Sequence, residues 1–182
     1  MMLKRLWSFC RKPEYLPYRK LPLLLRLKIV ASLVFWNLII GIGIVLLVEG
    51  LFQWLEIDMG KHKTEDMFLK YTYLQVFAMM VLLAPLIEEF IFRGPLIFFK
   101  RSSFFPIAFY LSCLLFGLVH LSNFEEGASL LWWAPLLVAP QALMGVFLGF
   151  LRVKLGLRYA ILMHMSHNGI LFLLISLIEL VE

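Results

Sequence analysis

The chain has 182 residues, of which 62% are hydrophobic and 16% are charged, and its net charge is +5. Soluble domains are nearer about 45–50% apolar and about 25% charged, so this composition excludes an ordinary water-soluble fold and indicates a protein embedded in lipid. The two cysteines exclude a disulfide framework. No DNA- or RNA-binding motif accompanies the positive charge, so we expect no nucleic-acid partner.

Residues 1–28 form a basic leader, which we expect in the cytoplasm or at the membrane surface. The leader contains eight of the 17 basic residues and directly precedes a long apolar segment. Such charges flank an uncleaved first span and bind a bilayer with anionic headgroups. Aromatic side chains among the charges predict an interfacial helix, interrupted at Pro13 and Pro17.

Residues 29–182 are expected to form a single transmembrane domain. A spanning helix needs about 20 mainly apolar residues, and five segments qualify. They cover approximately residues 29–52, 67–99, 105–121, 130–151 and 159–181. The predicted fold is therefore an all-α polytopic transmembrane bundle of about five spans with an N-terminal interfacial segment.

The second of these segments is too long for one span. As a helix it would extend roughly 50 Å, against a hydrocarbon core of about 30 Å. Gly94-Pro95 is the expected break, because proline lacks an N–H and disfavours helix at the preceding residue. We predict a helix to about Arg93, followed by a short segment along the inner surface.

The distribution of basic residues predicts the orientation. Thirteen lie in the segments that this topology places inside, while only Lys61, Lys63 and Lys70 lie in those placed outside. Because positive loops stay in the cytoplasm, we expect a cytoplasmic N-terminus and an outer C-terminus. The predicted location is a bacterial inner membrane.

The sequence APLIEEFIFRG places Glu88, Glu89 and Arg93 within the second span. Inserting a charged residue at the centre of a transmembrane helix costs about 2.5–3.5 kcal/mol on insertion scales. Such residues are therefore expected to have a structural or catalytic role. Glu89 and Arg93 are four residues apart and can form a structural salt bridge. Glu88 points about 100° away from Glu89, which favours a role as a general base.

Two further polar motifs lie on other spans. His120 follows Phe116 by four residues, and His164 precedes Asn168 by four. Each motif alone has a structural explanation, since polar side chains also join helices to one another. His167 is an alternative to His164 as the active histidine. Together with the glutamates, these groups form a constellation suited to acid–base chemistry.

The three motifs, EExxxR, FxxxH and HxxxN in this order, resemble the CPBP (Abi) family of CAAX prenyl endopeptidases and bacteriocin-processing proteins. The resemblance covers approximately residues 80–175. It implies an intramembrane endopeptidase that hydrolyses a peptide bond of a membrane-anchored protein or peptide. The alternative is a non-catalytic member of the family that confers immunity or acts as a membrane chaperone.

The resemblance also implies a role for each residue. Glu88 and His120 would activate the attacking water, and His164 and Asn168 would stabilise the oxyanion. The residues expected to support the site are Glu89, Arg93, Phe116 and His167. No metal is favoured, because the chain has no HExxH motif; zinc held by Glu88, His120 and His164 is the alternative.

The predicted topology carries one conflict. His120 falls near the outer end of its span and His164 nearer the inner end of its own, although a single site needs both histidines at one depth.

Overall fold

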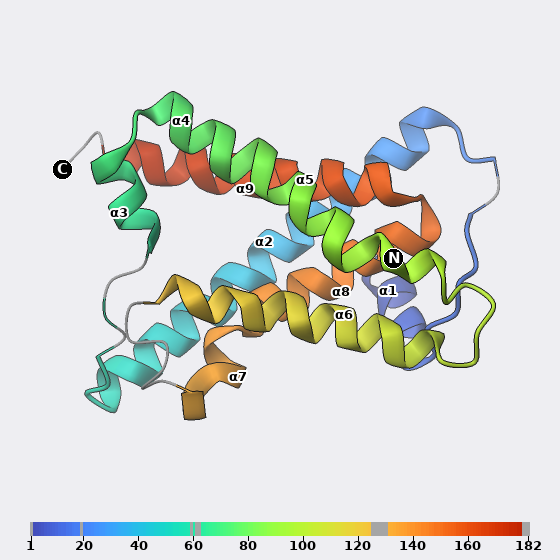
Figure 1. Ribbon diagram of the computed structural model, residues 1–182, viewed down its shortest axis with the longest axis horizontal. Helices are drawn as coiled ribbons and strands as arrows, with labels where there is room; N and C mark the ends of the chain where they lie inside the picture. The colour runs from blue at the N-terminus through green and yellow to red at the C-terminus, as the bar shows by residue number, and fades with distance from the viewer. Residues whose placement is uncertain (1, 19, 59, 61–62, 125–130, 180–182) are drawn as a thin grey trace.

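The structure is a computed structural model, and it describes residues 2–18, 20–58, 60, 63–124 and 131–179. Every regular element within these ranges is a helix (Figure 1). In this part of the chain, four helices are long and apolar enough to cross a membrane, and a bent pair offers a fifth span. The predicted all-α polytopic fold is confirmed.

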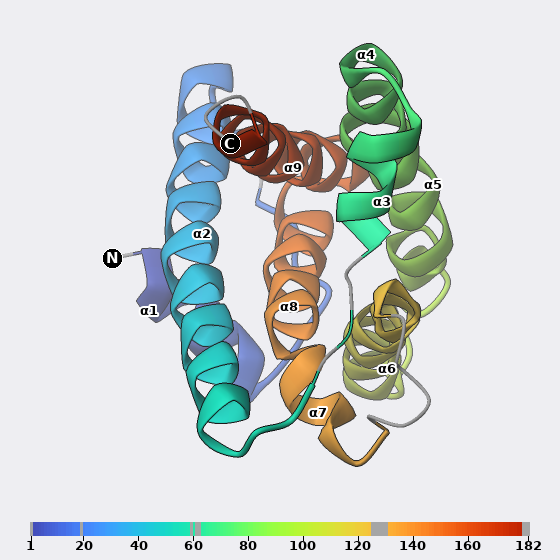
Figure 2. The ribbon, with the colours of Figure 1, turned by 90° about the vertical axis from the view of Figure 1, so that its left-hand side faces the viewer.

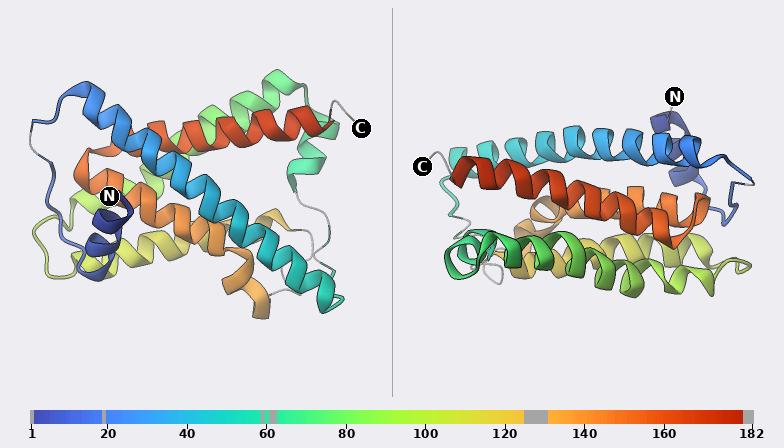
Figure 3. Two further views of the ribbon diagram at one scale, coloured as in Figure 1. Left: turned by 180° about the vertical axis from the view of Figure 1, so that it is seen from behind. Right: turned by 90° about the horizontal axis from the view of Figure 1, so that it is seen from above.

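The helices are arranged in three layers (Figures 2 and 3). One outer layer is α2 (Leu23–Trp54), and the middle layer is α8 (Ala139–Lys154) with α9 (Leu157–Glu179). The opposite layer contains α6 (Phe105–Val119) and the helix that carries Glu88. Large apolar side chains cover the outer faces of the layers, as expected where lipid replaces water as the solvent.

The leader packs against the same core as the spans. Its helix α1 (Met2–Arg11) ends before Pro13, as predicted. The Phe9 ring is buried and makes edge-to-face contacts with Phe109 of α6 and Phe150 of α8. The first span begins at Leu23, six residues before the predicted start, because Pro22 precedes it and a leucine-rich stretch favours helix.

The second predicted segment contains two helices rather than one. The helix α3 (Lys63–Lys70) ends before a turn, and Thr72 then forms a capping box with Gln75. The new helix comprises α4 (Tyr73–Phe77), a π turn (Ala78–Leu83), α5 (Ala84–Glu88) and a second π turn (Glu89–Arg93). A 3-10 turn (Pro95–Ile97) follows, so the predicted break at Gly94-Pro95 is confirmed.

The fourth predicted span is broken. A 3-10 turn (Leu131–Trp133) leads into α7 (Ala134–Leu137), which is bent by 47° relative to α8. Pro140 explains the bend, because its ring excludes a hydrogen bond to the preceding turn. The predicted start of this span at residue 130 lies outside the described residues. Lys61 and the predicted end of the fifth span at residue 181 also lie outside them.

Glycines allow α8 to approach α6 closely. A Cβ atom at Gly149 would lie 2.6 Å from the Phe109 ring, and one at Gly145 would lie 3.1 Å from Cys113 Cα. These glycines form the pattern GxxxG, a known signal for helix packing in membranes that the predictions above did not use. After α8, Gly156 adopts a φ of +101°, which glycine tolerates, and turns the chain into α9.

Candidate active site

The two glutamates lie at a junction between helix types. Glu88 ends α5 and Glu89 begins the second π turn, where the Gly94 N–H donates to the Glu89 carbonyl at 2.9 Å, five residues back. The Glu89 side chain is fully buried, whereas 24% of the Glu88 side chain is exposed. Single π turns are frequent at functional sites, and here the turn separates one buried from one accessible carboxylate.

One imidazole lies between the two carboxylates. His164 Nδ1 lies 3.1 Å from Glu89 Oε1, and its Nε2 lies 3.7 Å from Glu88 Oε2. Because an ionised carboxylate only accepts hydrogen bonds, Nδ1 carries the proton that it shares with Glu89. The distance at Nε2 is too long for a direct hydrogen bond. Nε2 is therefore close to Glu88 but remains available to bind another group.

The predicted pair of Glu89 and Arg93 is present. Arg93 NH1 lies 3.2 Å from Glu89 Oε1, and both side chains are completely buried. The guanidinium also lies over the Phe116 ring, 3.9 Å from its centroid. Pairing and the cation–π contact offset part of the cost of burying this charge, although Nε, NH1 and NH2 of Arg93 have no hydrogen-bond partner among the described residues.

Phe116 connects the three motifs. Its ring centroid lies 4.8 Å from that of His120 and 5.6 Å from that of His164. The expected conflict in depth therefore does not arise.

The hydrogen bond of His120 selects its tautomer. His120 Nδ1 lies 2.8 Å from the Phe116 carbonyl oxygen, which can only accept, so Nδ1 carries the proton. The neutral ring therefore has its lone pair on Nε2. This leaves Nε2 as the basic nitrogen of a ring that interacts electrostatically with Glu88.

Asn168 and His167 differ in their contacts. Asn168 Nδ2 donates to the Met80 carbonyl at 2.9 Å, within the first π turn, and its amide has a second hydrogen to donate. His167 Nδ1 is buried, and among the described residues no hydrogen-bond partner for it is present. Of the two candidate histidines, His164 is the one with contacts to both glutamates.

Two supporting residues were missed by the sequence analysis. Arg152 Nε donates to the Arg93 carbonyl at 2.9 Å, and the Ser112 hydroxyl donates to the Phe92 carbonyl at 2.7 Å. Arg152 was counted only among the inner basic residues, but it is buried within α8. In the sequence, its position within the apolar run FLGFLRV was the signal that this arginine is buried.

The site residues do not fit the zinc alternative. Within the described ranges, no group of three His, Cys, Asp or Glu side chains is arranged to hold a metal ion. We therefore derive no catalytic step through a metal.

Comparison with known families decides the broader classification. The model of the Rce1-like family, described as type II CAAX prenyl endopeptidase Rce1-like, matches residues 70–170, which is more than half of the chain. The chain belongs to the Rce1-like family. The matched range contains all three motifs and confirms the resemblance to CAAX endopeptidases. No individually curated protein and no solved structure matches the chain.

Membership of the Rce1-like family supports the expected membrane location and the expected class of protein. It makes this chain an integral membrane protein of a protease family, and such a family implies a lipid environment and a membrane-associated peptide substrate. The leader and α2 lie before residue 70, outside the matched range.

Proposed function

We propose that this Rce1-like chain is an intramembrane endopeptidase that cleaves a membrane-anchored protein or peptide, with Glu88 as the general base. The observation that supports this most directly is the His164 ring between Glu88 and Glu89, at 3.7 Å and 3.1 Å. The arrangement supplies one accessible carboxylate beside a buried hydrogen-bond donor. These are the groups that peptide hydrolysis needs at the attacking water and at the oxyanion.

The reaction begins with a water molecule between Glu88 and His120. Glu88 takes a proton from this water, while His120 Nε2 accepts its second hydrogen as a hydrogen bond. The resulting hydroxide attacks the carbonyl carbon and forms a tetrahedral oxyanion. Glu88 then returns the proton to the leaving amine as the C–N bond breaks.

The oxyanion is stabilised by His164 and Asn168. For this role, His164 must carry a proton on Nε2 as well as on Nδ1. Glu89 compensates the positive charge of that imidazolium while Glu88 holds the proton taken from water. The second amide hydrogen of Asn168 is available for the same oxygen. Glu89 fixes the His164 ring through its contact with Nδ1, and Glu89 is itself paired with Arg93.

The test is cleavage by the full chain reconstituted in liposomes. The substrates are a quenched fluorescent peptide with a farnesylated CAAX end, as the family description suggests, and a set of membrane-anchored peptides. Glu88→Gln should lower the cleavage rate about 10²–10⁴-fold, the usual contribution of general acid–base catalysis.

The matched control is Glu49→Gln. Glu49 is an exposed glutamate of α2, distant in sequence from the motifs, so its substitution should leave cleavage unchanged. If Glu88→Gln cleaves as fast as the parent, the proposal is wrong. If the parent protein cleaves no peptide in the set, the non-catalytic alternative is favoured.

A further inference from the structure

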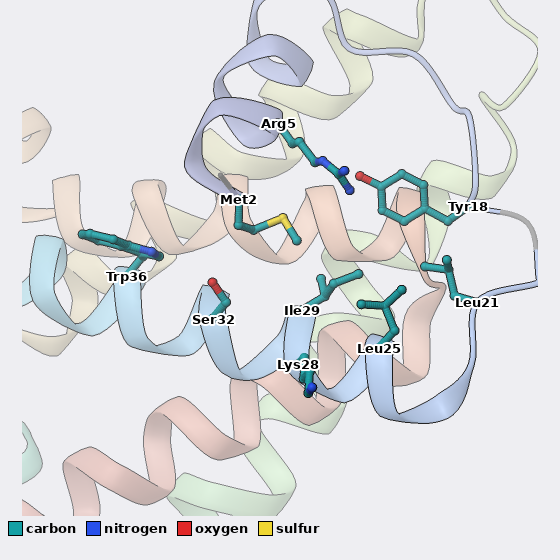
Figure 4. A pocket seen from close by; sticks show the side chains of 9 residues that line it. All are labelled: Met2, Arg5, Tyr18, Leu21, Leu25, Lys28, Ile29, Ser32 and Trp36. Carbon is teal, nitrogen blue, oxygen red and sulfur yellow. The ribbon is translucent and has the colours of Figure 1, made fainter.

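A cavity of about 460 Å³ lies between the leader and the first span, away from the glutamate site (Figure 4). Met2 and Arg5 of α1 and Tyr18 of the following segment line one side. The other side is formed by α2, including Lys28 and Trp36. All of these residues precede residue 70, so the family match assigns nothing to this cavity.

One part of the cavity is positively charged. Arg5 and Lys28 both line it, and no acidic side chain does. Neither cation forms an ion pair with any residue that the structure describes. The Tyr18 ring adds a hydroxyl donor, and its position is fixed because the Tyr18 N–H donates to the Lys154 carbonyl at 2.9 Å. The guanidinium of Arg5 and the hydroxyl of Tyr18 face each other and suit a phosphate group, while Lys28 adds positive charge elsewhere on the lining (Figure 4).

The remaining walls are apolar. Leu25, Ile29 and Trp36 lie along α2, so this wall extends about 16 Å at a rise of about 1.5 Å per residue. One leaflet of a bilayer contributes about half of a hydrocarbon core of about 30 Å. The groove therefore matches an acyl chain in length, next to a site for its phosphate.

We propose that this cavity is a specific site for one anionic phospholipid of the leaflet that contacts the leader. The phosphate lies at Arg5 and Tyr18, and an acyl chain lies along the apolar wall of α2, with Lys28 adding positive charge to the lining. The bound lipid joins α1 to α2. This site is independent of the proposed peptidase activity.

A neighbouring cavity of about 470 Å³ shares Arg5 and Tyr18 but suits a lipid chain less well. Its lining contains Glu14, whose carboxylate lies 2.8 Å from Lys12 Nζ and neutralises part of the positive charge. Its side chains are mainly polar, and it does not extend along a span. The lipid is therefore assigned to the cavity on α2.

The test is native mass spectrometry of the full chain released from micelles that contain equimolar phosphatidylglycerol and phosphatidylcholine. We expect one phosphatidylglycerol to bind in preference to phosphatidylcholine. Arg5→Gln and Lys28→Gln should each reduce this preference about fivefold, since one cation near an anionic surface contributes about 1 kcal/mol. Lys28 is exposed on α2, so its substitution tests the site even if the Arg5 variant is poorly folded.

Arg11→Gln is the matched control for charge, because Arg11 is exposed on α1 and lines neither cavity. It should retain the full preference. If all three variants lose the preference equally, general surface charge explains the binding. If the parent shows no preference, the cavity does not select an anionic lipid. Either result overturns the proposal.

A second pair of variants tests the apolar wall. Ser32→Leu fills the cavity without changing charge and should reduce lipid retention severalfold, whereas the neighbouring exposed position, Ala31→Leu, should not. Glycerol phosphate, which has no acyl chains, should not displace the lipid at equal concentration. Displacement by glycerol phosphate would mean a site for soluble anions and would overturn the assignment to a lipid.

Discussion

Arg152 donates a hydrogen bond from Nε to the carbonyl oxygen of Arg93, at 2.9 Å. The same guanidinium donates from NH1 to the Tyr15 hydroxyl at 3.1 Å. A single side chain of α8 thus connects the leader to the residue that ends the second π turn. The position of the glutamate site therefore depends on a segment outside the range matched by the family.

Arg152→Met should destabilise the protein by about 1.5–3 kcal/mol, the usual range for hydrogen bonds that involve a charged group. Tyr15→Phe removes only the outer bond and should cost less. Thermal unfolding in micelles measures both, with Arg101→Met in the exposed turn as a control expected to change stability by less than about 0.5 kcal/mol. Equal losses in the Arg152 and Arg101 variants would contradict this role.

Glu89→Gln and Arg93→Met should each cost about 3–5 kcal/mol, because each leaves its partner as an unpaired buried charge. The double variant should cost less than the sum, since no charge then remains unpaired. Glu88→Gln should unfold near the temperature of the parent, because Glu88 is partly exposed. A Glu88 variant as unstable as the Arg93 variant would contradict the assignment of a catalytic role to Glu88 and a structural role to Glu89.

Substitutions of His164 and His167 should have different effects on cleavage and stability. His164→Gln loses contacts with both glutamates and should reduce cleavage at least about 10²-fold. His167→Leu removes a buried nitrogen that has no hydrogen-bond partner among the described residues, so stability should be unchanged or increased. Cleavage rate and melting temperature are measured for both. Loss of cleavage in a folded His167 variant alone would reverse the assignment.

Gly145→Ala should be destabilising by about 1–3 kcal/mol through overpacking. The added methyl group would lie 3.1 Å from Cys113 Cα and 3.2 Å from Arg93 NH2, so it would press on both α6 and the site. Gly43→Ala on α2 is the matched control, because nothing lies within 4 Å of its added methyl group. It should be neutral or slightly stabilising through helix propensity. Similar unfolding temperatures for the two variants would refute the close packing.

Cleavage should persist when zinc is chelated, because the described site residues do not form a three-ligand group. The measurement is metal content of the purified active protein, together with cleavage in phenanthroline and in its non-chelating isomer. Both isomers should have the same small effect. Stoichiometric zinc, with activity lost on its removal and restored on its return, would overturn the metal-free mechanism.

Hydrophobicity alone determined the membrane class and the approximate spans. Lipid requires long apolar helices, and this requirement acts on each segment separately, so it is visible without the rest of the fold. The predicted break at Gly94-Pro95 and the pair of Glu89 and Arg93 were also accessible, because both depend on residues at most four positions apart. The cap at Thr72 and the bend at Pro140 have local signals as well, a threonine three residues before a glutamine and a proline near a helix start.

Only the tertiary structure decided how the motifs meet. No spacing within one helix predicts that His164 of α9 lies between Glu88 and Glu89, or that Phe116 contacts His164. These contacts depend on the crossing of helices that are separated by many residues, and the π turns shift which side chains face one another. The buried role of Arg152 has the same origin: its partner Arg93 is 59 residues away, and packing of α8 between the layers brings them together.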